Sequence, residues 1–138
     1  MAVSSIPRPR KCYRDADTHW YSDPRSVLRC QHGDRVVYAC PLNGGEYDSV
    51  YAADRLKYGR VYTVECVSVG STSSDLTLVE VPGSFNTVLF LRADVRHRGT
   101  VLTRAEIEAE MAERRKVVAR WDAALAGHAR REGADHAE

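Results

Sequence analysis

The segment Leu56–Val64, with the sequence Leu-Lys-Tyr-Gly-Arg-Val-Tyr-Thr-Val, constrains the fold most strongly because it places a glycine directly before a β-rich run. Gly59 permits a tight turn, and residues 60–69 are rich in β-branched and aromatic side chains. A polar turn over residues 70–75 separates this run from a second one at residues 76–81. Short strands joined by tight turns predict an antiparallel meander.

Two further runs complete a region that we expect to be all-β from residue 35 to residue 98. Residues 35–40 form the first expected strand, and residues 85–91 form the last. Asn-Gly-Gly inside residues 41–48 predicts a loop. Pairing of the last strand with the first would close the meander into a barrel and remove its exposed edges.

The 138 residues divide into three predicted parts: an irregular N-terminal arm (1–34), a small β-barrel (35–102), and an amphipathic helix with a loose tail (103–138). No apolar run reaches the length needed to span a bilayer, and the first residues lack the apolar segment of a secretory signal. We therefore expect a cytoplasmic protein.

A capping box at Thr103-Arg104-Ala105-Glu106 predicts the start of the helix. An apolar stripe follows at helical spacing, formed by Ile107, Met111, Val118, Trp121 and Leu125. Gly127 is expected to end or fray the helix, which leaves residues 133–138 as a tail.

A helix of this length exceeds the diameter of a small barrel, so we expect part of it to project. Ile107 and Met111 are predicted to pack on the barrel. The projecting part could contact a partner protein or form a homodimer, and the candidate partner-binding residues are Arg114, Arg115, Trp121 and Leu125.

A resemblance to a known group rests on Leu56-x-x-Gly59-Arg60-Val61-Tyr62-Thr63-Val64, followed by Leu76-x-Leu78-x-Glu80-Val81 and then Phe85 to Arg92. This pattern resembles small proteins of tailed phages and prophages that carry a Leu-x-x-Gly-Lys-x-Tyr-x-Val signature and look like SH3-type barrels. Arg60 stands where that group usually has lysine. The resemblance covers roughly residues 35–97, without the N-terminal arm and the C-terminal helix, and implies an SH3-like barrel and a phage context. Together with the predicted helix, the expected fold is an SH3-like small β-barrel plus helix, in the host cytoplasm.

Phage accessory proteins of this size often bind and inhibit host machinery, anti-CRISPR proteins among them. By that analogy, the leading hypothesis is a non-enzymatic protein-binding accessory protein that inhibits a host defence complex sterically. A virion structural protein is a further alternative.

A second alternative is a nucleic-acid-binding barrel that uses two basic clusters. Its candidate residues are Arg8, Arg10, Lys11, Tyr13, Arg14, Arg92, Arg96 and Arg98. Against it, residues 35–102 hold seven basic and seven acidic side chains, and the net charge of the chain is only +1.

The cysteines are expected to be free thiols, with Cys66 buried in the strand over residues 60–69. Cys30, His32 and Cys40 are possible zinc ligands, but no Cys-x-x-Cys pair accompanies them. Two pairs of carboxylates, Asp15 with Asp17 and Asp48 with Asp54, are typical of solvated loops. We therefore expect no catalytic site and no cofactor, and the question of a metal at Cys30, His32 and Cys40 stays open.

Overall fold

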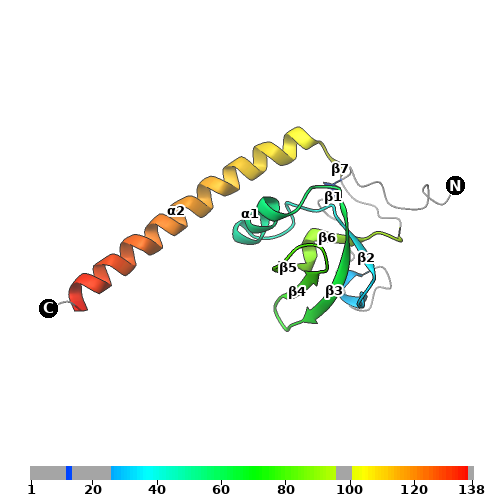
Figure 1. Ribbon diagram of the computed structural model, residues 1–138. Coiled ribbons are helices and arrows are strands. Elements are labelled where there is room, and N and C mark those ends of the chain that lie inside the picture. The colour runs from blue at the N-terminus through cyan, green and yellow to red at the C-terminus, as the bar shows by residue number, and fades with distance from the viewer. Residues whose placement is uncertain (1–11, 14–25, 96–100, 137–138) are drawn as a thin grey trace.

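The computed structural model describes residues 12–13, 26–95 and 101–136 (Figure 1). Single 3₁₀ turns are labelled η. In chain order the elements are β1 (Cys12–Tyr13), η2 (Val27–Arg29), β2 (Arg35–Tyr38), α1 (Glu46–Arg55), β3 (Val61–Val69), β4 (Ser74–Leu78), β5 (Ser84–Asn86), η3 (Thr87–Leu89), β6 (Phe90–Arg92), β7 (Val101–Leu102) and α2 (Arg104–His136). The fold is mainly β with a C-terminal helix, as the sequence predicts.

Five strands form one antiparallel sheet in the order β5-β4-β3-β2-β6. The last strand, β6, pairs with the first, β2, as expected, with Val37 opposite Leu91. Among the described residues, however, no strand pairing joins β5 to β6, so the sheet is open and the closed barrel of the prediction is not observed.

The expected single strand over residues 85–91 is broken at η3. Asn86 causes the break locally, because its side-chain oxygen accepts a hydrogen bond from the Val88 amide at 3.1 Å. The residues before the turn pair with β4, and the residues after it pair with β2. The 3₁₀ turn therefore moves the chain from one edge of the sheet to the other.

A β-bulge in β3 overturns the prediction that Cys66 is buried. Val64 lies opposite Leu78 and Cys66 lies opposite Thr77, so Glu65 is an extra residue in β3. The bulge shifts the alternation of side chains by one position, which exposes Cys66 and turns Val67 toward the core.

Helix α1 occupies a segment that the sequence assigns partly to a loop. Gly45 is its N-cap, and Glu46 and Asp48 place negative charge in the first turn, where the helix dipole favours it. The residues that α1 buries are Ser49 and Ala52. Because both side chains are small, no hydrophobic stripe reveals this helix in the sequence.

The signature motif serves the fold. Leu56 is buried after α1, and Gly59 turns with a φ of 83° while its amide donates to the Tyr38 carbonyl. The buried Tyr62 accepts a hydrogen bond from the Lys57 amide through its hydroxyl, and Val64 lies in the main core. These contacts explain the residue types at this spacing without any catalytic role.

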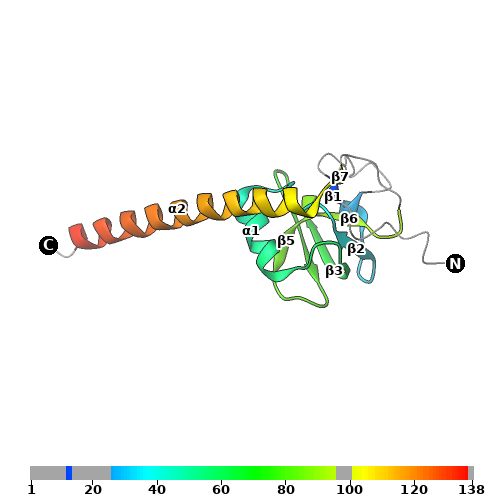
Figure 2. The ribbon, with the colours of Figure 1, turned by 90° about the horizontal axis from the view of Figure 1, so that it is seen from above.

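Helix α2 begins at the predicted capping box, where the Glu106 amide donates to the Thr103 hydroxyl at 3.1 Å. Ile107 and Met111 are buried with Leu42 and Leu102, which confirms that this part packs on the body. Gly127 does not end the helix, because α2 continues to His136 and so includes part of the predicted tail. Its 33 residues span ~50 Å, and its C-terminal part projects beyond the body (Figures 1 and 2).

The two parts of the predicted arm that the structure describes both contact the body. Strand β1 pairs with β7, and Val27 and Cys30 belong to the main core. The three-part division of the chain itself stays a prediction.

Candidate protein-interaction surface

Arg114, predicted to bind a partner, is the residue that holds α2 against the body. Its guanidinium donates to the carbonyls of Gly44 (2.7 Å) and Leu42 (2.9 Å) and to the Ser49 hydroxyl (2.6 Å). Glu110, one turn earlier, lies 3.7 Å from it. With only 18% of its side chain exposed, Arg114 is engaged inside the chain.

Two further contacts, both exposed, join α2 to α1. Arg115 forms an ion pair with Asp54 of α1. Farther along, the Tyr47 hydroxyl donates to Asp122 at 3.1 Å. Partial burial and the Asp122 carboxylate raise the pKa of Tyr47, so the phenol stays protonated and keeps donating. These polar contacts orient α2 over α1 as far as Asp122.

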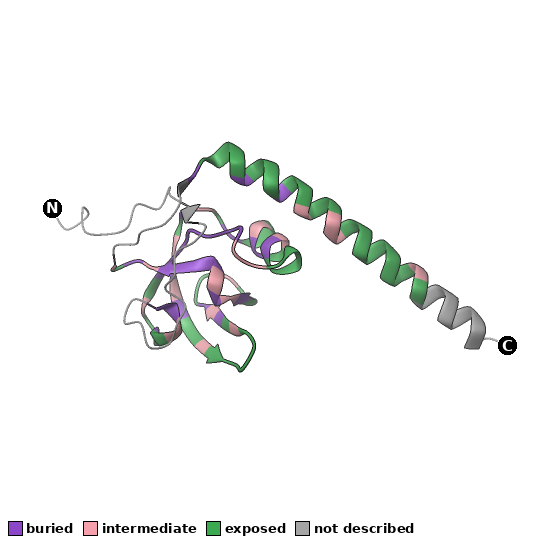
Figure 3. Ribbon diagram, turned by 180° about the vertical axis from the view of Figure 1, so that it is seen from behind, coloured by how far each residue is buried: buried purple, intermediate pink, exposed green. Residues whose placement is uncertain are grey.

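Around Asp122, α2 presents a second apolar face, which we call the distal face and define as Val117, Trp121, Ala124 and Leu125. Their spacing of four, three and one places them on one side of a helix. Trp121 is 59% exposed and Leu125 is 61% exposed, so neither is a core residue. Figure 3 shows the exposed character of α2 where it leaves the body.

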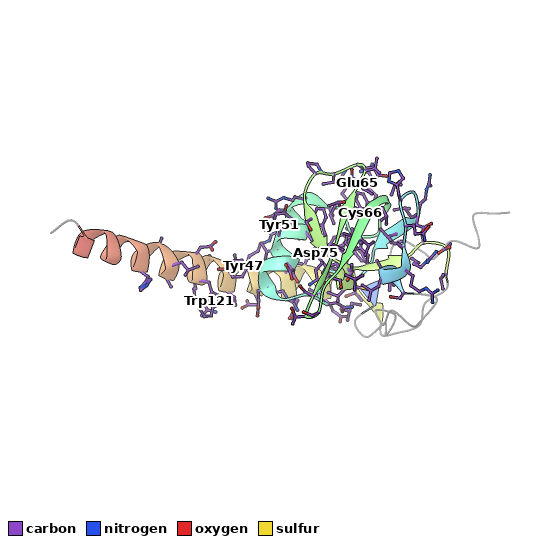
Figure 4. All side chains as sticks on the ribbon, turned by 90° about the horizontal axis from the view of Figure 1, so that it is seen from below. Tyr47, Tyr51, Glu65, Cys66, Asp75 and Trp121 are labelled. Carbon is purple, nitrogen blue, oxygen red and sulfur yellow. The ribbon has the colours of Figure 1, made fainter. Side chains whose placement is uncertain are left out.

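A second surface lies on α1, and we call it the tyrosine face (Tyr47 and Tyr51). Tyr47 is 47% exposed. Tyr51 packs against the buried Phe85 with ring centroids 5.5 Å apart, and the Arg55 guanidinium stacks on its outer side at 3.6 Å. Figure 4 shows both tyrosines on α1, with Trp121 farther along α2. The two surfaces are adjacent because Tyr47 contacts Asp122.

Sequence reasoning did not select the tyrosine face, although a signal for it exists. Tyr47, Tyr51 and Arg55 follow one another at intervals of four, which is the spacing of one helical face. The sequence reasoning assigned Tyr47 to a loop over residues 41–48 and gave no element to Tyr51 and Arg55, so it did not use the helical spacing of these three residues.

The nucleic-acid alternative has one candidate side chain in the described region, Arg92. It forms ion pairs with Asp94 at 3.2 Å and Asp34 at 4.0 Å, and its hydrogen bond to Asp94 raises its pKa further. Arg92 therefore carries a locally balanced charge. The remaining candidates lie where the structure describes no side chain: Arg8, Arg10, Lys11, Tyr13, Arg14, Arg96 and Arg98.

The cysteine and histidine candidates lie in separate surroundings. Cys30 and Cys40 are buried, whereas His32 is exposed with Nδ1 3.1 Å from the Glu65 carbonyl. Burial raises the pKa of Cys30 to about 11, despite the opposing effect of Arg92, so its thiol stays protonated. Within the described ranges, no three potential ligand side chains gather around one point.

The fold and these surfaces define a small mainly β body whose two helices expose aromatic and aliphatic side chains. The chain belongs to the family of the bacteriophage T4 protein Y07B, because the model of that family matches residues 36–113, more than half of the 138 residues. The match supports a phage origin. No curated protein and no solved structure matched the chain. In the part of the chain that the structure describes, no helix is both long and apolar enough to cross a membrane.

Proposed function

We propose that this phage protein is a non-enzymatic accessory protein that binds another protein through its two helices. One observation carries the proposal. Among the described residues six large hydrophobic side chains are exposed, and four of them lie on α1 and α2: Tyr47, Tyr51, Trp121 and Leu125.

These side chains are of the types that carry binding energy. Tryptophan and tyrosine bury a large area with little loss of conformational freedom, and both are enriched among the residues that dominate protein interfaces. Tyr47 contacts Asp122, the residue that follows Trp121, in a helix crossing whose geometry Arg114 fixes. A partner would therefore meet a preorganised surface, which lowers the entropic cost of binding.

Two finer features belong to the same proposal. The return of β6 beside β2 supports assigning the sheet to the SH3-like class in an open form. The predicted action, steric obstruction of a host defence complex in the host cytoplasm in the manner of anti-CRISPR proteins, follows from the phage origin by analogy.

The test is capture of partners from a lysate of a host-type bacterium with the tagged full chain, with and without nuclease. Matched baits carry Tyr47→Ala, Trp121→Ala or, as a control, Val69→Ala. Val69 is also an exposed apolar residue (53%) but lies on β3. We expect a stoichiometric, nuclease-resistant protein that is lost with a helix variant and retained by the control.

Two results would reject the proposal. The first is recovery of the same proteins by all baits. The second is recovery of nucleic acid together with proteins that disappear on nuclease treatment, which would favour the nucleic-acid-binding alternative. If a partner is found, growth of phage on hosts with and without that partner tests whether binding is inhibitory.

A further inference from the structure

The distal face lies where α2 leaves the body. The Tyr47 hydroxyl of α1 donates a hydrogen bond to Asp122 of α2. Residues 123–136 continue the helix for ~20 Å. Two of the four residues of the distal face, Ala124 and Leu125, lie in this extension.

The composition of this extension makes an isolated helix unfavourable. It contains Gly127 and Gly133, and glycine is among the weakest helix formers. Helical segments of this length are marginal in water unless an apolar face packs against something. With Trp121 and Leu125 each about 60% exposed, the apolar area for such packing is present.

We propose that a second copy of this chain covers the distal face, so that two α2 helices pack antiparallel around a two-fold axis between Trp121 and Ala124. This proposal rests on the proposed function in one respect. The dimer proposal assigns the distal face to a second copy of this chain, and the tyrosine face then remains for the partner protein of the proposed function.

The sizes of the side chains favour a second copy. Trp121 is large and Ala124 is small, and they lie three residues apart on the same face. A two-fold axis between them places each Trp121 against the partner copy's Ala124, so that large side chains meet small ones across the interface. A parallel pair would instead set the two tryptophans side by side.

The charges favour a second copy as well. Residues 117–136 contain three basic and three acidic side chains: Arg120, Arg130 and Arg131 against Asp122, Glu132 and Asp135. A segment with this balance does not repel its own copy, and it does not select a strongly charged foreign partner.

The available area indicates a weak dimer. At 59% exposure, each Trp121 offers on the order of 150 Å², so the two tryptophans supply about a quarter of the ~1,200 Å² typical of a stable interface. Leu125, Val117 and their neighbours must supply the rest. We expect a dissociation constant on the order of micromolar.

Sedimentation velocity of the full chain from about 1 to 300 μM tests the proposal. The mass should rise with concentration from the monomer value of 15.4 kDa toward twice that value. Trp121→Ala and Leu125→Ala should each weaken dimerisation by at least about tenfold, and Val69→Ala should leave it unchanged. A monomer at every concentration, or a dimer that is indifferent to Trp121→Ala, would overturn the proposal.

The orientation can be tested through Cys66, which is exposed on the body. A spin label on Cys66, in a Cys12→Ser background, reports the distance between the two bodies by pulsed electron paramagnetic resonance. The body contacts α2 from Ile107 to Asp122, so an antiparallel pair displaces the two bodies from each other by about 25 Å along the helix axes. A parallel pair in register leaves the two bodies side by side with no such displacement. A short distance would refute the antiparallel pair.

These outcomes separate the two proposals. If the chain is monomeric but capture of a host protein still depends on Tyr47, the dimer is refuted and the proposed function stands. If the dimer forms but no bait captures a partner protein, the proposed function is refuted and the dimer stands.

Discussion

Replacing Arg114 by methionine should destabilise the protein strongly, although both residues have long, flexible side chains. The guanidinium is mostly buried and donates three hydrogen bonds to Leu42, Gly44 and Ser49. Without it the Leu42 carbonyl loses this donor, whereas the Gly44 carbonyl still accepts from Ser49 at 3.3 Å. Because hydrogen bonds to a charged donor contribute 1.5–3 kcal/mol each and are not additive, we expect a loss of about 3 kcal/mol.

The assay is urea unfolding followed by circular dichroism. With a slope of about 1.5 kcal/mol per molar urea, Arg114→Met should lower the unfolding midpoint by about 2 M. Arg114→Lys should fall between wild type and Arg114→Met, because lysine keeps the charge but lacks the planar fork that reaches several acceptors.

The neighbouring residue supplies the control. Arg115 is paired with Asp54, and both side chains are nearly half exposed, so Arg115→Met should cost less than about 1 kcal/mol. If the two methionine variants have the same midpoint within about 0.3 M, Arg114 does not hold α2 on the body and the reasoning fails.

Three further predictions concern the body. Gly59→Ala should cost about 1–2 kcal/mol in a urea titration, because φ is 83° there and a side chain is strained in that region; a neutral result would contradict the turn. Burial raises the pKa of Glu80, but hydrogen bonds from the Thr63 amide and hydroxyl outweigh it and lower the pKa below its usual 4.5. Wild type should therefore have a higher free energy of unfolding than Glu80→Gln at neutral pH, and this difference should shrink as the pH falls below about 4.5. A difference that grows in unfolding curves measured from pH 7 down to pH 3 would contradict the lowered pKa of Glu80. Finally, the exposed Cys66 should react with a thiol reagent in the folded protein much faster than the buried cysteines, as peptide mapping can show, and equal rates would refute the bulge.

The features that sequence reasoning found are those that repeat along the chain or depend on neighbours. Alternating apolar residues predicted β3, and the spacing of Ile107 and Met111 predicted the packed face of α2. The capping box lies within four residues and needs no tertiary information.

The features that it missed depend on distant partners or on small side chains. The bulge at Glu65 follows from pairing with β4, and nothing in the local alternation signals it. Arg114 was predicted to bind a partner, and its role inside the chain was missed because its acceptors lie about 70 residues earlier in the sequence. Helix α1 escaped because Ser49 and Ala52, its buried side chains, are too small to form a hydrophobic stripe.

The family match includes some of the surfaces described above and leaves out others. The match covers residues 36–113, which include the sheet, α1 and the packed part of α2. In this range the signature residues Gly59 and Tyr62 are explained by folding alone. Trp121 and Leu125 lie past the end of the match, where α2 leaves the body. The matched range therefore holds the sheet, the tyrosine face and the packed part of α2, whereas the contact that we propose between two copies of the chain centres on residues outside it.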